Sequence, residues 1–334
     1  MFKIKKDKFG NMSRAFYLCS MKRRKKIIIR WVVGTLSLLI GVIIGSSFYI
    51  LNYSLASAPD RMDTDSCYIR LYENYPETEE WVDSLHQLNA LRDTFLTFPE
   101  GYRCHAYYVK KGNESKGSQR TALLIHGWRD QAINFFYLAR MYERDFGYNV
   151  VMPDVYGHGQ SDGDVVRMGW LDRLDMLVWL DAFKTDTMVV HGVSMGGATT
   201  MMVAGEALPT GIKDIQFVND CGYTSVWDEF AGEMKVRFGL PEFPLMYTSS
   251  LLCKLCYGWS FGEASSLDQV RKCPYPMLFI HGDQDTFVPT EMVYRLYEAK
   301  PAPKELWISR NTGHAQSYKN HREEYIRRVR EFLK

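Results

Sequence analysis

One serine stands in a context that would make it a nucleophile. Gly192-Val193-Ser194-Met195-Gly196 follows the pattern Gly-x-Ser-x-Gly, with an apolar run at residues 187–190 before it and a helical pattern at residues 196–208 after it. A strand, this motif and a helix in succession form the tight turn that projects a serine hydroxyl. Glycines on both sides relieve the crowding that such a strained turn creates. We therefore interpret Ser194 as a nucleophile, with an ordinary glycine turn as the alternative.

A serine hydroxyl needs a base to remove its proton, and the base needs a carboxylate to orient it. His314 follows the last apolar run and lies on a Thr-Gly-His-Ala loop, where an imidazole could reach Ser194. Two aspartates follow apolar runs: Asp285 after residues 277–280, and Asp220 after residues 215–218. With Asp285, the three groups occur in the order nucleophile, acid, base.

The segments that must position these groups alternate between strand-like and helical patterns. Short apolar runs occur at residues 121–125, 149–152, 187–190, 215–218, 277–280 and 305–308, and helical patterns at 133–146, 170–183, 196–208, 291–298 and 318–333. Alternation of this kind predicts right-handed crossovers and an α/β fold, with a mainly parallel, doubly wound sheet covered on both faces. Residues 79–95 also have a helical pattern. Residues 224–273 break the rhythm, are rich in aromatic and Met residues, and are predicted to form a small helical cap insertion.

At this point the chain resembles the α/β-hydrolase superfamily, over residues 103–334. Within it, the chain is similar to membrane-anchored bacterial hydrolases related to serine aminopeptidases, lysophospholipases and acyl-protein thioesterases. The resemblance implies an α/β-hydrolase domain at residues 60–334. Because His281-Gly282-x-x-Asp285-x-x-Val288-Pro289 matches a family motif, it also implies Asp285 as the acid, with Asp220 as the competitor.

Acyl transfer needs amide donors for the oxyanion that develops on the carbonyl oxygen. The Met195 amide lies at a helix start, where backbone N–H groups lack helical partners. By the resemblance, the second donor is the amide of Trp128 in His126-Gly127-Trp128-Arg129-Asp130. This loop departs from the three-glycine form found in some carboxylesterases. We expect His126 to shape the loop, His191 to be a satisfied residue at a sheet end, and His105 to be solvated.

The expected chemistry uses no cofactor and no metal. Cys253-Lys254-Leu255-Cys256 has zinc-like spacing, but no second pair and no suitably spaced histidine accompany it. Seven cysteines are present, and the six that follow Cys19 permit disulfides in an oxidising compartment without specifying the pairing.

The N-terminal region has the pattern of a membrane anchor. Residues 1–30 contain 11 Lys and Arg residues and one acid, a net charge of +10, which leaves 30 bases and 38 acids in the rest of the chain. The 21 residues from 31 to 51 carry no charge, and a bilayer core about 30 Å thick needs about 20 helical residues. Residues 1–30 are therefore predicted to form a basic cytoplasmic tail and residues 31–51 a single-pass transmembrane anchor, with the catalytic domain on the outer side. Ala56-Ser57-Ala58 resembles a signal-peptidase site, so cleavage is the alternative.

Composition and spacing also bear on partners. The acidic body argues against nucleic acid, because phosphate contacts need a basic face. Ser37, Gly41 and Gly45 share one face of the anchor, a pattern that permits a homodimer through the transmembrane helix.

The sequence therefore predicts a membrane-anchored serine hydrolase that cleaves an ester or thioester of a small-molecule or lipid-like acyl substrate. A serine peptidase of the same fold and a non-catalytic binding module are the alternatives.

Overall fold

The central feature of the molecule is an eight-stranded sheet with the strand order β1-β2-β4-β3-β5-β6-β7-β8. The computed structural model describes residues 5–110 and 119–334, with side chains from residue 16 onward. Strands β3 to β8 run parallel, whereas β1 and β2 are antiparallel at one edge. The strands are β1 Leu91–Thr97, β2 Arg103–Val109, β3 Arg120–Ile125, β4 Asn149–Pro153, β5 Thr187–Val193, β6 Asp214–Asp220, β7 Met277–Gly282 and β8 Lys304–Ser309.

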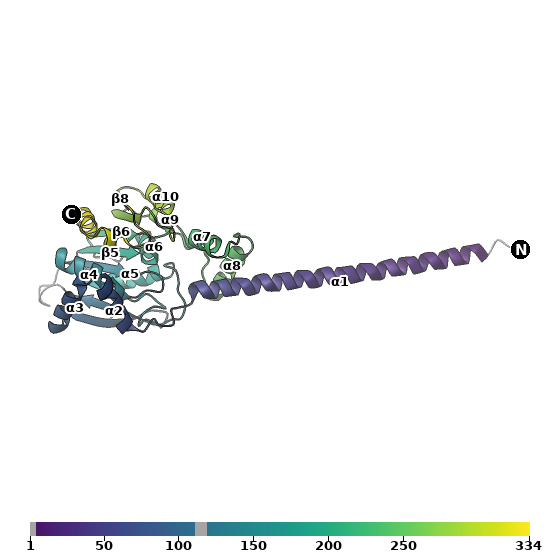
Figure 1. The fold of residues 1–334 in the computed structure, drawn as a ribbon, viewed down its shortest axis with the longest axis horizontal. Coiled ribbons are helices and arrows are strands. Elements are labelled where there is room, and N and C mark those ends of the chain that lie inside the picture. Colours follow the sequence, from purple (N-terminus) through teal and green to yellow (C-terminus); the bar gives the residue numbers. More distant parts are fainter. Residues whose placement is uncertain (1–4, 111–118) are drawn as a thin grey trace.

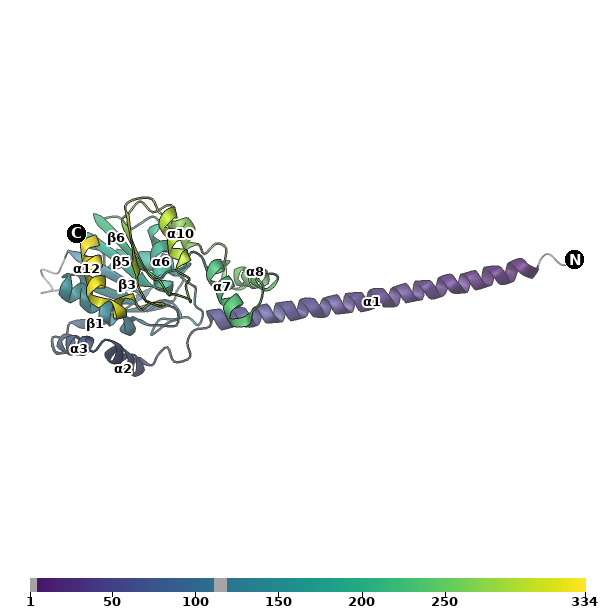
Figure 2. The same ribbon diagram turned by 45° about the horizontal axis from the view of Figure 1, so that its top comes forward.

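Helices cover both faces of this sheet (Figures 1 and 2). One face packs on α5 Asp172–Ala182, α6 Met195–Ala204, α9 Ser266–Val270 and α10 Glu291–Ala299. The other packs on α2 Thr64–Asn74, α3 Glu77–Gln87, the short helices between residues 132 and 145 (η2 Ala132–Phe135, α4 Phe136–Arg140 and η3 Met141–Asp145) and α12 Arg322–Phe332, which follows the single turn α11 Ser317–Asn320. Side chains alternate between the two cores, as with Leu123 on one face and Leu124 on the other. This arrangement confirms the predicted doubly wound fold.

The predicted helix at residues 79–95 is wrong beyond Gln87. Helix α3 ends there, and β1 pairs antiparallel with β2, from Leu91 opposite Val109 to Thr97 opposite Arg103. Strand β1 lies at the sheet edge and is largely exposed, so it lacks the apolar run that marks the central strands.

The cap insertion consists of α7 Val226–Phe238 and α8 Leu245–Tyr257, and it precedes α9 on the way from β6 to β7. Figures 1 and 2 show α7 and α8 at the end of the domain from which the long N-terminal helix departs.

That helix, α1 Lys5–Leu55, projects from the domain as a rod (Figure 1). Its section Phe16–Leu55 is long and apolar enough to cross a membrane by length and composition, with a mean hydropathy of 2.4 in its most apolar window. The helix continues past the predicted anchor end at Leu51. Leu51 and Leu55 are only 2% and 1% exposed and belong to the core of the hydrolase domain. The end of α1 is thus a structural part of the domain.

Candidate active site

Ser194 occupies a strained turn between β5 and α6. Its backbone has φ 58° and ψ −121°, a conformation that non-glycine residues rarely adopt. The turn is possible because its flanking glycines allow close contact: a Cβ on Gly192 would lie 2.0 Å from the Gly196 carbonyl oxygen, and one on Gly196 would lie 2.0 Å from the Ile125 carbonyl oxygen. Strain of this kind persists where the surrounding structure enforces it, which is the geometry expected of a nucleophile elbow.

The structure brings Ser194, His314 and Asp285 into one hydrogen-bonded chain. His314 Nε2 lies 2.8 Å from Ser194 Oγ, and His314 Nδ1 lies 2.8 Å from Asp285 Oδ2. The other carboxylate oxygen, Oδ1, accepts hydrogen bonds from the amides of Phe287 and Val288 at 3.0 and 2.9 Å. With the imidazole proton on Nδ1, Nε2 is free to accept the proton of the Ser194 hydroxyl.

Asp285 is held in its ionised form. Burial opposes ionisation, but hydrogen bonds from His281 and His314 outweigh it and lower the pKa of Asp285 to about 2. An ionised carboxylate fixes the imidazole tautomer and stabilises the imidazolium when it forms.

Asp220, the competing acid, has a different partner. The Tyr325 hydroxyl donates to Asp220 Oδ2 at 2.9 Å, and the same hydroxyl lies 2.9 Å from His191 Nε2. Burial raises the pKa of Asp220 to about 6, even though the Tyr325 hydrogen bond acts in the opposite direction. Asp220 therefore belongs to a buried Tyr-His network, and His314 pairs with Asp285.

The two residues expected to supply the oxyanion-binding amides lie close to Ser194. Met195 is the first residue of α6, so its N–H lies among those without a helical acceptor. The Gly127 position, next to Trp128, faces Ser194 so closely that a Cβ there would lie 4.0 Å from Ser194 Oγ. Trp128, Ser194 and Met195 also line one pocket.

The loop that contains Trp128 is hydrogen-bonded directly to the end of α1. Trp128 Nε1 donates to the Ser54 carbonyl at 3.0 Å, and the Arg129 guanidinium donates to the carbonyls of Tyr53 and Ala56, each at 3.0 Å. The carbonyls of Tyr53 and Ser54 are among those that a helix end leaves without intrahelical donors, and Ala56 directly follows the helix. The Trp128 ring therefore packs on α1, an arrangement that the sequence did not indicate.

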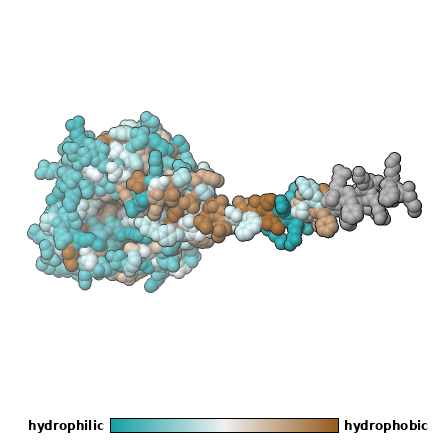
Figure 3. Space-filling model, turned by 45° about the vertical axis from the view of Figure 1, so that its right-hand side comes forward, coloured by the Kyte–Doolittle hydropathy of each residue, from teal (hydrophilic) through white to brown (hydrophobic). Residues whose placement is uncertain are grey.

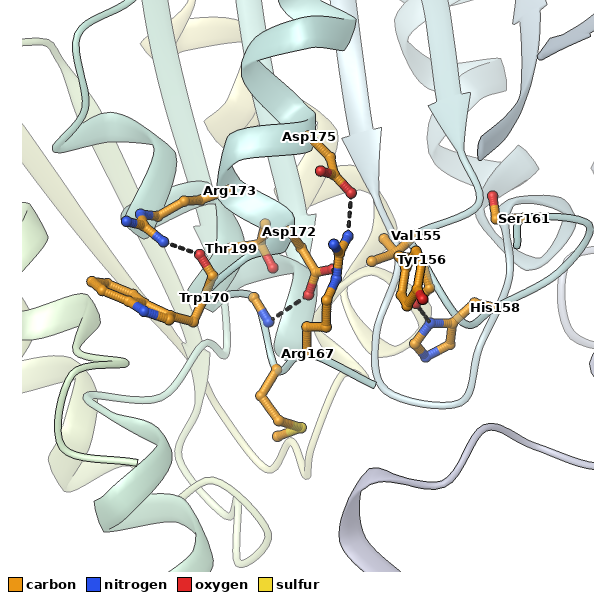
Figure 4. A network of polar contacts seen from close by, with 12 residues as sticks. Val155, Tyr156, His158, Ser161, Arg167, Trp170, Asp172, Arg173, Asp175 and Thr199 are labelled. Carbon is orange, nitrogen blue, oxygen red and sulfur yellow. Dashed lines mark hydrogen bonds and ion pairs between the residues drawn. The ribbon is translucent and has the colours of Figure 1, made fainter. Parts of the chain in front are cut away.

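An ion-pair network supports the adjacent loop between β4 and α5 (Figure 4). Arg167 Nε donates to Asp172 Oδ1 at 2.9 Å, and the guanidinium also pairs with Asp175, both on the first turn of α5. The Val166 amide donates to the Leu55 carbonyl at 2.6 Å. The network thus holds in place the segment around Val166, to which the end of α1 is hydrogen-bonded.

Two cavities meet at Ser194. The first, which we call the cap pocket, lies beneath α7 and α8 and includes Ile50 and Tyr53 of α1. Its lining is mostly apolar and includes Met168, Tyr223, Phe230, Met234, Met246 and Phe261. The second, which we call the open cavity, adjoins His314 and carries polar side chains, among them Arg70, Asn74, Asp130, Asn134, Gln316 and Lys319.

The cap pocket contains one buried carboxyl. Glu229 on α7 is 4% exposed, and its Oε2 has no hydrogen-bond partner among the described residues. Burial, reinforced by the nearby Glu233, raises the pKa of Glu229 well above its ordinary value. A neutral carboxylic acid is therefore expected in this lining. This buried acid could not be recognised from the sequence, because Glu229 is one of several acids scattered over the cap.

Three of the remaining histidines are buried and have structural partners. His126 accepts a hydrogen bond from the Val155 amide at 2.9 Å, and burial lowers its pKa, so it stays neutral in its loop. His191 lies between two tyrosine hydroxyls, and burial lowers its pKa to about 3. The expectation of a solvated His105 is wrong: its ring is fully buried and bonds to Asp154 at 2.8 Å.

Among the described residues, one cluster of side chains has potential metal ligands close to one another. Ligand atoms of Cys221, Asp285 and His314 lie within 4.8 Å of one another. Asp285 and His314 are already joined by a hydrogen bond, and burial raises the pKa of the Cys221 thiol well above its ordinary value, so the thiolate form that binds metals is disfavoured. The seven cysteines all carry free thiols, including Cys253 and Cys256 on α8.

The family follows from comparison with known proteins. A family model described as the alpha/beta hydrolase family matches residues 122–327, and the chain belongs to this family. It is similar to the uncharacterized protein YqkD of Bacillus subtilis (strain 168), with 29% identity over 264 residues that cover 77% of this chain and 84% of YqkD.

Two further similarities are more limited. The chain is 30% identical over 122 residues to Lipase 1 of Psychrobacter immobilis, a match that covers 35% of this chain and 36% of the lipase. The esterase Pf2001 of Pyrococcus furiosus has the same fold, with a TM-score of 0.58 and 24% identity, over 75% of this chain and 92% of the esterase.

Proposed function

We propose that the protein is a membrane-anchored serine hydrolase that cleaves carboxylic esters or thioesters. The observation that carries the proposal is the continuous chain from Asp285 through His314 to Ser194, with 2.8 Å at both contacts of the imidazole. Every part of the acyl-transfer machinery is represented, which argues against a non-catalytic binding module.

The proposed reaction proceeds in two acyl-transfer steps. His314 Nε2 takes the Ser194 proton as the Ser194 oxygen attacks the substrate carbonyl, while the amides of Trp128 and Met195 stabilise the oxyanion. The imidazolium, stabilised by Asp285, then gives its proton to the leaving alcohol or thiol, and an acyl-enzyme forms. Water activated by His314 releases the acid and regenerates the serine.

The two cavities suggest how a substrate is oriented. The cap pocket suits an apolar acyl chain, because its lining consists mainly of Met and aromatic side chains. The open cavity suits the polar leaving group. A peptidase would need a charged site for a substrate amine near Ser194. Glu229 does not provide one, because burial keeps it neutral, and Glu233, the other acid of the lining, is paired with Arg237.

A substrate panel on the full chain in detergent tests this activity. We expect hydrolysis of p-nitrophenyl acetate and, with a higher kcat/KM, of p-nitrophenyl dodecanoate, and no cleavage of aminoacyl p-nitroanilides. Ser194→Ala is the control. Preferential anilide cleavage would establish the peptidase alternative, and ester hydrolysis that survives in Ser194→Ala would refute the proposed nucleophile.

We further propose that α1 spans a membrane, with the N-terminus in the cytoplasm and the catalytic domain on the outer side. The basic cluster at residues 22–26 before the apolar run supports this orientation. An uncleaved anchor is also favoured, since cleavage after Ala58 would remove Leu51 and Leu55 from the core. A homodimer through Ser37, Gly41 and Gly45 remains a prediction.

Cysteine labelling of intact cells tests the orientation. Cys19 is exposed on α1, and Leu88 is 75% exposed on the catalytic domain. In a Cys256→Ser background, which removes the exposed cysteine of the catalytic domain, a membrane-impermeant maleimide should label Leu88→Cys and leave Cys19 unmodified. The reverse labelling pattern would invert the topology.

A further inference from the structure

The outer face of the cap is unusually apolar. In the described residues from 56 to 334, thirteen large apolar side chains are exposed, and seven of them lie within residues 236–255. We call these seven the cap apolar face: Val236, Phe238, Leu240, Phe243, Tyr247, Leu251 and Leu255. In Figure 3, hydrophobic side chains gather where the domain meets α1.

Helix α8 shows why this face is not ordinary packing surface. Its inner side buries Met246, Ser249 and Cys253, as expected for a cap helix. Its outer side carries Tyr247, Leu251 and Leu255, spaced four residues apart and 56%, 59% and 72% exposed. A helix that is apolar on both sides is typical of a completely buried or membrane-contacting environment.

The position of α8 relative to the proposed membrane span identifies the occupant of this face. Ser47 of α1 is fully buried, and its carbonyl accepts a hydrogen bond from Ser249 of α8 at 3.4 Å. Arg30 is the last charged residue before the apolar run, and Ser47 lies 17 positions further along the helix. At about 1.5 Å per residue this length is roughly 26 Å, less than the hydrocarbon core of about 30 Å. With Arg30 at one membrane surface, the other surface lies at or beyond the level of α8, and any tilt of α1 places α8 deeper.

The side chains at this level are those that membrane interfaces favour. Tyr49 and Tyr53 of α1 are 67% and 40% exposed, and the cap contributes Phe243 and Tyr247. Tyr53 contacts Phe238 with the ring centroids 6.4 Å apart. Aromatic side chains of this kind concentrate at the boundary between hydrocarbon and water.

The same residues connect the surface to the active site. Tyr53 and Phe238 are partly exposed on the outer surface and also line the cap pocket that contains Ser194. The rim of the pocket is therefore continuous with the cap apolar face.

We propose that the cap apolar face inserts into the bilayer surface from which α1 emerges, and that the cap pocket takes the acyl chain of a membrane-resident lipid ester directly from that leaflet. This inference rests on the proposed anchor and serine hydrolase activity, and it adds the substrate class and the route of entry.

Two measurements on the full chain in phosphatidylcholine vesicles test the proposal. In the first, an environment-sensitive NBD fluorophore is attached to Leu251→Cys in a background with Cys19→Ser and Cys256→Ser. The matched control carries the fluorophore at Leu88→Cys, which is 75% exposed on the other side of the domain. We expect blue-shifted emission and quenching by spin-labelled lipids at position 251 only. Water-like emission at both positions would overturn the proposal.

The second measurement compares substrates with one chromophore. The double variant Leu251→Glu/Leu255→Glu should hydrolyse aqueous 4-methylumbelliferyl acetate within twofold of the wild type, and vesicle-dissolved 4-methylumbelliferyl palmitate at least tenfold more slowly. Leu88→Glu is the control. Equal palmitate hydrolysis by the double variant and the wild type would also refute the proposal.

The outcomes separate the claims. Absence of acetate hydrolysis in the wild type would contradict the proposed activity, whereas the fluorescence result still decides membrane contact. Failure of the wild type to float with vesicles would contradict the anchor.

Discussion

The two cavities that meet at Ser194 are built from different parts of the chain. The open cavity is formed by the loops that follow the central strands together with α2, whereas the cap pocket combines α7 and α8 with the end of α1. The open cavity carries charged and amide side chains among apolar ones, whereas the cap pocket is almost entirely apolar. In the proposed mechanism, the loops that follow the strands therefore supply the reacting groups, while the insertion and the N-terminal helix form the wall of the pocket for the acyl chain. The end of the helix is thus part of the folded domain as well as its proposed tether.

The largest effect on activity is expected from substitution of Asp285, which orients His314 beside Ser194, where the two cavities meet. Asp285→Asn should lower kcat by about 10⁴-fold for short and long acyl esters alike, because the amide no longer fixes the imidazole tautomer. Steady-state kinetics on p-nitrophenyl esters measure this. Asp220→Asn is the matched control, since Asp220 pairs with Tyr325, and its kcat should fall by less than about tenfold. A larger loss in Asp220→Asn than in Asp285→Asn would reverse the assignment of the acid.

Removing the end of α1, which forms one wall of the cap pocket, should lower the stability of the fold as well as disrupt the pocket. A fragment that starts at Asp60 loses Leu51 and Leu55, each worth about 1.5–3 kcal/mol of burial. Relative to a fragment that starts at Gly41, its Tm should fall by roughly 10 °C. Calorimetry on both fragments measures the difference, and equal Tm values would show that the end of α1 contributes nothing to the fold.

Narrowing the cap pocket should change the preference for acyl length, whereas narrowing the open cavity should change the preference for the alcohol. Met246→Trp fills the cap pocket and should lower kcat/KM for dodecanoate esters by about 10–100-fold, with acetate esters little affected. Lys319→Trp, in the open cavity, should instead discriminate against bulky alcohols. If both variants shift acyl-length preference equally, the division of roles between the cavities is wrong.

The smallest effect concerns the carboxyl in the cap pocket. Because the folded protein raises the pKa of Glu229, the folded state retains its proton above the pH at which the unfolded chain releases it. This carboxyl therefore destabilises the fold increasingly as pH rises above about 4.5. Glu229→Gln should stabilise the protein by about 1 kcal/mol more at pH 8 than at pH 4.5, measured by urea unfolding. A pH-independent difference would mean that Glu229 is ionised in the fold.

The central sheet and the positions of Ser194, Asp285 and His314 could be predicted from the sequence for a physical reason. Central parallel strands are buried on both faces and appear as apolar runs, and Ser194, Asp285 and His314 each follow one of them. Loops after parallel strands share one edge of the sheet, so residues far apart in the chain converge there.

The cap pocket could not be predicted in the same way. A helix that is apolar all round gives no sign of which side will pack, so the docking of α1 was hidden by its membrane-like composition. The only signal was that an apolar residue recurs at Leu55, one helical turn after Leu51, past the end of the predicted anchor. Glu229 was missed because burial depends on tertiary packing, and the edge strand β1 because it lacks an apolar run.

The most direct test of the central claim is covalent labelling of the nucleophile. A fluorophosphonate probe reacts with a serine that a neighbouring base has activated. Intact-mass spectrometry of the full chain should show one added probe, peptide mapping should locate it on Ser194, and the Ser194→Ala and His314→Asn variants should remain unlabelled. Labelling at another residue, or none on the folded wild-type protein, would contradict the account.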